Sequence, residues 1–307
     1  MPLNDHFREL SAQVRNWGRW GDDDRLGTVN FIDDEARRRG ASSVRSGKAF
    51  SLAIPLEFDG PQLGFIGRRQ NPQHTMLEIN SPGVLDPEFK SSDDMIVLCL
   101  QAATHWDGLS HVSYEGNLYN GVPAASITVN GATVLGIQHL KTLTGRGVLL
   151  DIARLKGVDQ LEGGYAVTGD DLDAAAEMGR VTIESGDIVM LRTGQMQTLK
   201  AGDKMSYTMT AAGPSLQSVE WFHRNEIAAV AVDNGTFEVF PCEYDTMPLP
   251  VHLLHLVDMG LTQGQHFDME ELAADCADDG QYTFLLSAPP QPITNATGSP
   301  VNPIAVK

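Results

Sequence analysis

Hydrophobic residues occur in short runs along the whole chain. Each run is rich in Val, Ile and Leu and is bounded by Gly, Asp or a turn-forming cluster, as buried strands are. Four such runs are FSLAIPL (50–56), MIVLCL (95–100), GVLLDI (147–152) and DIVMLRTG (187–194). EIAAVAVDN (226–234) and YTFLLSAP (282–289) extend the series. The pattern predicts six buried strands.

Helical patterns lie between these strands. Asp33 is a predicted N-cap, followed by acidic residues in the first turn and by Gly40 as a stop. Thr168 and Asp171 form a variant of the capping box at the start of another helix. The segments 215–226 and 268–280 are also predicted helices, the first amphipathic and the second running from an acidic start to a Gly stop. Interspersed strands and helices indicate an α/β or mixed α+β fold.

Two long segments, 58–83 and 287–307, are full of Gly, Pro, Asn and Gln. Ordered loops of this length in a compact enzyme are often binding loops or lids, but surface excursions and oligomer contacts explain them equally well. We find no repeat of fixed period, and the apolar signal covers the whole length. We therefore expect one domain over residues 1–307, with an N-terminal arm and long Pro/Gly-rich loops.

Composition narrows the possible partners and compartments. The chain has 307 residues, 42% of them hydrophobic, with 22 Lys and Arg against 40 Asp and Glu, for a net charge of −18. That charge opposes binding to nucleic acid or to anionic membrane surfaces. The polar N-terminus and the lack of a long apolar run predict a cytoplasmic protein. Three widely spaced cysteines fit a reducing compartment.

The stretch LQAATHWDGLSHVSYEG (100–116) carries the densest group of candidate ligands. If the run from Met95 continues as a strand to Asp107, then Gln101, His105 and Asp107 project to the same side. An imidazole, a carboxylate and an amide oxygen suit Zn²⁺ or Mn²⁺, which lowers the pKa of bound water to about 7. His111 has the same parity and could accept the proton of that water. The alternative is that these residues only cap a strand end and bond to loop backbone.

The stretch THWDGLSHVSYEGNLYNG (104–121) resembles the signature of the putative cyclase family, metal-dependent hydrolases that include kynurenine formamidase and isatin hydrolase. In the family pattern H-x-G-T-H-x-D-x-P-x-H, the matching residues are Thr104, His105, Asp107 and His111. Long-form members are also similar at 16–32, 67–76, 190–194, 231–241 and 297–307. The resemblance implies a swivelling β/β/α fold with a central mixed sheet flanked by helices, assembled as a homodimer or homotetramer.

The departures from the family pattern concern the metal site. Gln101 stands where the family has its first His, Ala103 replaces its Gly, and Leu109 replaces its Pro. By position, His252 matches a downstream His of the two-metal members, but Gln265 replaces their Glu. A second metal site like that of the two-metal members would therefore lack two of its ligands in this chain. We expect one divalent metal per subunit, Mn²⁺ or Zn²⁺, held by Gln101, His105 and Asp107.

Further residues have candidate roles beside the metal. The resemblance makes His252 a proton carrier or substrate donor, whereas His255, in the same apolar stretch, is expected to be structural. Asp233 and Glu238, near the end of a predicted strand, could complete a polar network.

The candidate substrate contacts are two tryptophans and a basic loop. Trp17 and Trp20 could form a wall against a cyclic or aromatic substrate, or could instead anchor the N-terminus. Arg68, with its neighbour Arg69, and His74 could hold a substrate carboxylate, or could be solvated charges of a surface loop.

The sequence lacks the G-x-S-x-G, phosphate-loop and G-x-G-x-x-G motifs. The primary hypothesis is therefore a metal-dependent hydrolase that opens a cyclic or acyl amide, or a lactone, by attack of hydroxide on the carbonyl carbon. His111 would be the general base, and His252 would assist the leaving group. A lyase or cyclase that uses the metal as a Lewis acid, and a non-hydrolytic metal-bearing binding protein, remain open alternatives.

Overall fold

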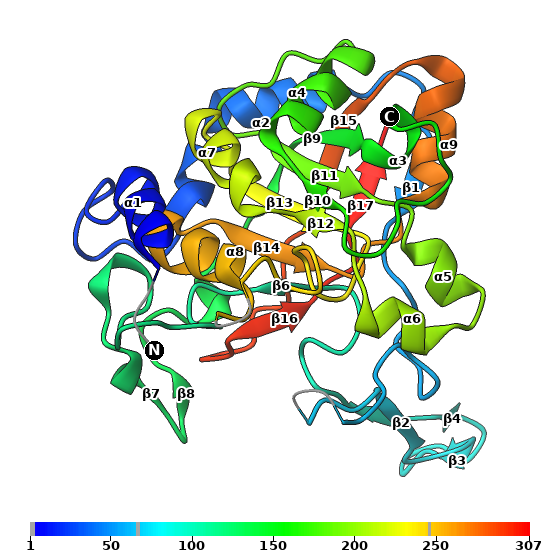
Figure 1. Cartoon of the computed structure of the whole chain (residues 1–307). Helices are drawn as coiled ribbons and strands as arrows, with labels where there is room; N and C mark the ends of the chain where they lie inside the picture. Colours follow the sequence, from blue (N-terminus) through cyan, green and yellow to red (C-terminus); the bar gives the residue numbers. More distant parts are fainter. Residues whose placement is uncertain (1–3, 66–67, 245–246) are drawn as a thin grey trace.

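A nine-stranded mixed sheet forms the centre of the protein (Figure 1). We describe a computed structural model over residues 4–65, 68–244 and 247–307. Four parallel strands lie in the middle of the sheet: β9 (Thr144–Asp151), β11 (Ile188–Arg192), β13 (Ala229–Val232) and β14 (Thr262–Gln265). Antiparallel strands flank them: β15 (Thr283–Ser287), β17 (Ile304–Val306) and β1 (Ala49–Ser51) beyond β9, and β6 (His105–Asp107) and β16 (Gly298–Pro300) beyond β14. The sheet curls into a half-barrel with flanking helices, which confirms the mixed α/β class.

Helices cover both faces of the central strands. One face packs against α1 (Asp5–Val14), α3 (Ile152–Leu155), α4 (Gly169–Met178), α7 (Leu216–Arg224), α8 (Pro250–His252) and the π-helical segment η5 (Leu253–Met259). The other face packs against α2 (Asp34–Ser42) and α9 (Glu270–Asp279). Along β9, Val148 and Leu150 join the first layer and Leu149 the second, because side chains alternate along a strand. Burial on both faces explains why β9, β11 and β13 contain continuous apolar runs, whereas β14 is equally buried but has the polar sequence TQGQ and was not predicted.

Shorter elements connect these layers. They are η1 (Gly27–Phe31), η2 (Tyr119–Gly121), η3 (Ala124–Ser126), η4 (Ile137–His139), α5 (Met196–Lys200), α6 (Lys204–Met209), β7 (Ile127–Thr128), β8 (Gly131–Ala132), β10 (Ala166–Val167) and β12 (Gly213–Pro214). Within the described ranges, none of the helices is long and apolar enough to cross a membrane.

Two of the predicted helix starts, at Asp33 and Thr168, are confirmed by their caps. The side chain of Asp33 accepts a hydrogen bond from the backbone N–H of Ala36 at 2.8 Å, and Thr168 and Asp171 form the reciprocal capping box. The predicted helix end at Gly40 was wrong, because α2 continues through Gly40 to Ser42. A Cβ at Gly40 would lie 2.5 Å from the carbonyl carbon of Gly145, so this glycine allows α2 to pack closely on β9.

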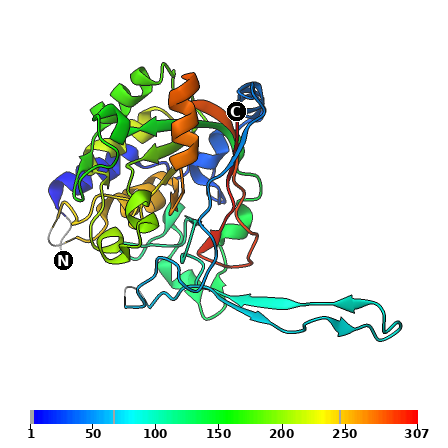
Figure 2. The ribbon, with the colours of Figure 1, turned by 90° about the vertical axis from the view of Figure 1, so that its right-hand side faces the viewer.

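Two of the six predicted buried strands were wrong. The run 50–56 supplies only the short edge strand β1, two of whose three residues are exposed. The run 95–100 supplies β5 (Asp94–Val97), which is exposed and pairs with β2 (Gln73–Met76) in a projecting hairpin (Figure 2). The chain then turns at 98–104, so the expected continuous strand to Asp107 is broken. Conversely, the loop expected at 287–307 contributes β16 and β17 to the sheet.

Candidate metal and catalytic site

Strand β6 carries two of the predicted metal ligands. His105 and Asp107 alternate with Trp106, so they project from one side of the strand and Trp106 projects from the other. Trp106 packs edge-on against Phe267 at 5.1 Å, and its indole Nε1 donates to the carbonyl oxygen of Ala288 at 2.9 Å. The buried indole therefore fixes which side of β6 presents His105 and Asp107 to the site.

His105 and Asp107 each present one buried atom without a hydrogen-bond partner. The Nδ1–H of His105 donates to the carbonyl oxygen of Ala103 at 2.7 Å, so Nε2 carries the lone pair. This Nε2 lies 3.5 Å from Oδ1 of Asp107, and neither atom has a hydrogen-bond partner. Leaving buried polar atoms unpaired costs about 1–3 kcal/mol each. Two ligands of a tetrahedral Zn²⁺ at about 2.0–2.1 Å would lie about 3.4 Å apart. The pair therefore fits a divalent cation.

The carboxylate of Asp107 is ionised despite its burial. Burial by itself raises the pKa of Asp107, but the adjacent His111 and His105 outweigh it and hold this pKa well below its usual value. The two oxygens differ in their surroundings. Oδ2 accepts a hydrogen bond from Nε2 of Gln265 at 2.8 Å, whereas Oδ1 faces the two imidazoles. Because a carboxylate only accepts, the NH₂ end of the Gln265 amide must point at it.

Gln101 lies in the turn before β6, not on the strand. A Cβ added at Gly298 would lie 2.6 Å from Nε2 of Gln101, and Gly298 is the register partner of Asp107 on β16. The absence of a side chain at Gly298 thus leaves room for the Gln101 amide beside the carboxylate-bearing strand. Among the residues that the structure describes, no three His, Cys, Asp or Glu side chains form a metal-holding group.

His111 is placed to exchange a proton at the same carboxylate oxygen. Its Nε2 lies 3.6 Å from Oδ1 of Asp107, and its side chain is 19% exposed. Burial is the largest influence on the pKa of His111 and lowers it, an effect that Asp107 only partly opposes. His252, Arg69 and His105 lower this pKa further. The imidazole is therefore neutral at pH 7 and can accept a proton.

His252 is held by a buried glutamate that sequence reasoning had assigned only to a polar network. Its Nδ1 lies 2.6 Å from Oε1 of Glu238, so Nδ1 carries the proton and Nε2 is left to exchange one. Glu238 is 1% exposed and also accepts the backbone N–H groups of Val251 and His252, both at 2.9 Å. These bonds cap the start of α8 and fix the imidazole. The arrangement of a base and its orienting carboxylate is typical of catalytic histidines.

The surroundings of His255 favour the structural role expected for it. Its ring packs edge-on against Phe222 and Phe237, and its Nδ1 lies 3.1 Å from the side-chain nitrogen of Gln263. Complete burial lowers the pKa of His255 to about 3. This imidazole is therefore neutral throughout the physiological range.

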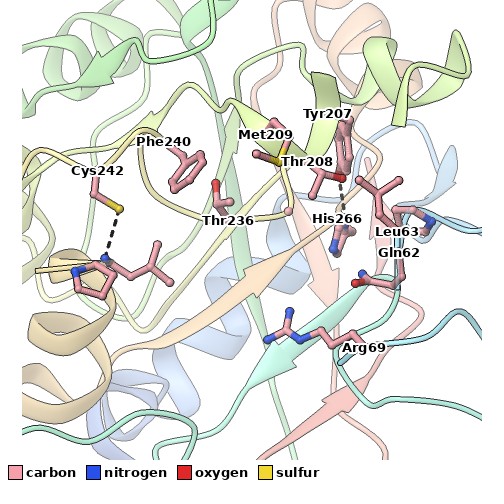
Figure 3. A pocket seen from close by; sticks show the side chains of 14 residues that line it. Gln62, Leu63, Arg69, Tyr207, Thr208, Met209, Thr236, Phe240, Cys242 and His266 are labelled. Atoms are coloured by element: carbon pink, nitrogen blue, oxygen red, sulfur yellow. Dashed lines mark hydrogen bonds between the residues drawn. The ribbon is translucent and has the colours of Figure 1, made fainter. Parts of the chain in front are cut away.

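A cavity of about 260 Å³ borders the candidate site through His266, but its lining does not include His105, Asp107, His111 or His252. Figure 3 shows His266 and Tyr207 on one wall, with Arg69 nearby. The ring of His266 is centred 5.8 Å from that of His105, so this wall borders the candidate metal site. Apolar and small groups complete the lining: Pro61, Leu63, Met209, Gly235, Thr236, Phe240, Cys242, Pro248 and Leu249, with Gln62 and Thr208. The cavity suits a compact, largely apolar molecule.

Sequence reasoning missed His266 and Tyr207. His266 has φ of 60°, an unusual conformation for a residue with a side chain, and its Nδ1 lies 2.8 Å from the Tyr207 hydroxyl. Its backbone N–H donates to the carbonyl oxygen of Asn234 at 2.9 Å. The only signal in the sequence was its position directly after Gln265. No sequence pattern marked Tyr207 as a site residue, because the tertiary structure alone brings α6 next to His266.

The residues predicted to contact the substrate, Trp17, Trp20, Arg68 and His74, do not line this cavity. Trp17 donates from Nε1 to the carbonyl oxygen of Val257 at 2.7 Å, and Trp20 packs edge-on against Phe31 at 5.0 Å. Neither lines the cavity, and these contacts favour the anchoring alternative. Arg68 is exposed, whereas its neighbour Arg69 lines the cavity. His74 lies on the exposed strand β2, where it pairs with Asp94 at 2.7 Å.

Comparison with known proteins gives the family. Residues 49–239 match the profile of a family described as putative cyclase. The solved structure of a protein described as a novel cyclase is 41% identical to this chain, with a TM-score of 0.87, and the match covers 96% of this chain and 100% of the other. No curated protein matches the sequence.

Two more distant solved structures share the fold. An isatin hydrolase bound to the product analogue thioisatinate is 17% identical, with a TM-score of 0.62, and the match covers 89% of this chain and 98% of the other. A predicted metal-dependent hydrolase from Bacillus stearothermophilus is 13% identical, with a TM-score of 0.52, and the match covers 84% of this chain and 97% of the other.

Proposed function

The chain belongs to the putative cyclase family, and on that premise we propose that it is a metal-dependent hydrolase that opens a cyclic or acyl amide, or a lactone. One observation carries the proposal: His105 Nε2 and Asp107 Oδ1 are buried, unpartnered and 3.5 Å apart, with His111 beside them. When bound there, one Mn²⁺ or Zn²⁺ per subunit would polarise the substrate carbonyl and activate a water molecule.

The residues of this chain divide the remaining tasks. His105 and Asp107 would hold the cation, with Gln101 as our candidate for a third protein ligand. His111 accepts the proton of the attacking water, for which its neutral imidazole is suited. His252, oriented by Glu238, delivers a proton to the leaving nitrogen or oxygen. The hydrogen bond with Glu238 orients the His252 imidazole before the substrate binds.

The substrate we propose is small, cyclic or aromatic. A cavity of about 260 Å³ with a mainly apolar lining limits the size, and Arg69 offers a guanidinium for a carboxylate or a developing negative charge. The thioisatinate held by the distant isatin hydrolase supports an aromatic ring with a carboxylate as the product class. Gln265 supports the single metal, because its amide occupies the Asp107 oxygen that a second cation would need.

The test combines metal analysis with an isotope experiment. Protein dialysed against Mn²⁺ or Zn²⁺ should retain one metal per chain by inductively coupled plasma mass spectrometry. A panel of aryl formamides, isatins and lactones should be turned over in H₂¹⁸O, with one ¹⁸O appearing in the product carboxylate. Turnover without ¹⁸O would instead establish a lyase or cyclase, and binding of the panel without turnover would establish a binding protein.

A further inference from the structure

His266 lines the cavity and also borders the candidate metal site (Figure 3). Its backbone, at φ of 60°, is held on both sides: the N–H donates to the carbonyl oxygen of Asn234 at 2.9 Å, and the carbonyl oxygen accepts from Oγ1 of Thr104 at 2.6 Å. A Cβ at Gly235 would lie 2.8 Å from Cε1 of the ring, so a glycine there leaves room for the imidazole. The fold therefore fixes this ring where a molecule in the cavity would meet it.

The hydrogen bonds of Tyr207 decide which ring nitrogen of His266 carries the proton. The Tyr207 hydroxyl lies 2.8 Å from Nδ1 of His266 and 3.3 Å from the backbone carbonyl oxygen of Asp233. Burial, together with the Asp233 carboxylate, raises the pKa of Tyr207 well above its usual value, so the phenol keeps its single proton. Among the described residues, no other group donates to that buried carbonyl, and buried carbonyls are nearly always paired. The Tyr207 hydroxyl therefore donates to Asp233, and the Nδ1–H of His266 donates to Tyr207.

Nε2 of His266 is consequently a hydrogen-bond acceptor. A neutral imidazole with its proton on Nδ1 has a lone pair on Nε2. Burial lowers the pKa of His266 well below its usual value, and His105 and Arg69 lower it further, so the ring is neutral. Within the described ranges, Nε2 has no hydrogen-bond partner, whereas Nδ1 has one. A molecule in the cavity can supply the missing donor.

The other polar side chains of the lining have mostly spent their protons. The hydroxyls of Thr208 and Thr236 donate to backbone carbonyl oxygens at 2.7 and 3.0 Å, and the side-chain nitrogen of Gln62 donates to another at 2.9 Å. Gln62 thus keeps its amide oxygen as a competing acceptor, and Arg69 can only donate. The cavity therefore suits a ligand that carries an acceptor such as a carboxylate for Arg69 and an N–H donor for His266.

We propose that Nε2 of His266 accepts the N–H of the substrate, so that the site takes a secondary amide in preference to a lactone of the same shape. This preference narrows the substrate class of the proposed function and rests on that function. A ring oxygen in place of the N–H would set its lone pairs against the lone pair of Nε2 and leave this buried acceptor unpaired. A site built to hydrogen-bond a ligand group rejects the isostere that lacks it.

The test compares two ligands of the same shape that cannot be hydrolysed. Indole-2-carboxylate and benzofuran-2-carboxylate differ only in the ring N–H and the ring oxygen, and each carries a carboxylate for Arg69. Isothermal titration calorimetry on the full-length protein at saturating Mn²⁺ should show that the indole binds about 10- to 100-fold more tightly. Equal affinities, tighter binding of the benzofuran, or no binding of either ligand would overturn the proposal.

Variants assign the preference to His266. Asn tolerates positive φ, so His266→Asn should keep the fold and bring the ratio of the two affinities close to one. Tyr207→Phe removes the acceptor of Nδ1–H and lets the proton move to Nε2, so it should also lower the ratio. The matched control is Tyr165→Phe, which removes a hydroxyl bonded to Asp171 away from the cavity and should leave the ratio unchanged. If His266→Asn retains the native ratio, Gln62 is the acceptor and the proposal is wrong.

Nuclear magnetic resonance reads the position of the proton without any ligand. In long-range ¹H–¹⁵N spectra of histidine-labelled native protein, the ring signals that vanish in His266→Asn should show a protonated Nδ1 and an unprotonated Nε2. A proton on Nε2 would overturn the proposal. An indole preference without turnover of amides in H₂¹⁸O would remove the proposed hydrolase and keep this ligand class, whereas turnover without the preference would do the reverse.

Discussion

His105 Nε2 and Asp107 Oδ1 lie 3.5 Å apart in the buried interior, and neither has a hydrogen-bond partner, while His111 Nε2 lies 3.6 Å from the same carboxylate oxygen. Two such atoms facing each other are costly unless a cation lies between them. We expect Asp107→Ala to lose the bound metal and to lower kcat/KM by about 10³-fold or more, which corresponds to several kcal/mol of lost carbonyl polarisation. Metal analysis and steady-state kinetics check this, with the exposed Asp34→Ala as the control. An active, metal-free Asp107→Ala protein would refute the site.

His111→Ala should separate proton transfer from metal binding. His111 lies 3.6 Å from Oδ1 of Asp107 and is assigned as the general base, not as a ligand. We expect the variant to retain one metal per chain while kcat falls by about 10²- to 10⁴-fold, the usual contribution of a general base. If the metal is lost together with activity, His111 is a ligand and the assignment is wrong.

Glu238 should act through His252 alone. A hydrogen bond to a charged group contributes about 1.5–3 kcal/mol, so Glu238→Gln should lower kcat by about 10- to 100-fold with little change in KM or metal content. In a double-mutant cycle, Glu238→Gln should have almost no further effect on kcat once His252 is replaced by Ala. Additive losses in the cycle would show that Glu238 has a role independent of His252.

Gln265 should limit the site to one metal. Gln265→Glu places a second carboxylate beside Oδ2 of Asp107 and removes the amide donor. We expect the metal content at saturating Mn²⁺ to rise from one to two per chain, and the metal-free variant to be less stable because like charges then adjoin. Gln263→Glu is the matched control, since Gln263 is on the same strand but contacts His255. Two tightly held metals in the native protein would contradict the single-metal assignment.

Because His255 is buried in its neutral form, the free energy of unfolding should decrease as the pH falls below about 6.5. Burial lowers its pKa in the folded protein to about 3, whereas the unfolded chain takes up this proton near pH 6.5. Between these values the unfolded state binds more protons, so the free energy of unfolding decreases as the pH falls, by up to about 1.4 kcal/mol per pH unit. Above pH 6.5 this contribution is constant.

Urea unfolding at pH 7.5, 6 and 5 measures this dependence. His255→Gln removes the titrating group, so the variant should show a shallower loss of stability between pH 6 and 5 than the native protein. His6→Gln, at an exposed position on α1, is the control and should leave the slope unchanged. Parallel curves for the native protein and His255→Gln would contradict the prediction.

The sequence by itself determined the features that depend on near neighbours. The caps at Asp33 and Thr168 require only the next three residues, and the relation of His105 to Asp107 follows from the alternation of a strand, so both could be predicted. Three of the four central strands, β9, β11 and β13, were also predictable, because burial on two faces makes them continuous apolar runs, whereas the fourth, β14, is TQGQ and gave no apolar signal.

Only the tertiary structure decided which distant residues contact these elements and which of the predicted strands are buried. The apolar run from Met95 looks like a core strand, yet β5 is exposed, because no local signal shows whether a helix or water faces a strand. Gln265 reaches Asp107, and Tyr207 reaches His266, because β14 and α6 return to the site from distant parts of the chain. Hydrogen bonds between such residues depend on strand order and helix placement, which arise from packing of the whole sheet and leave no periodic trace in the sequence.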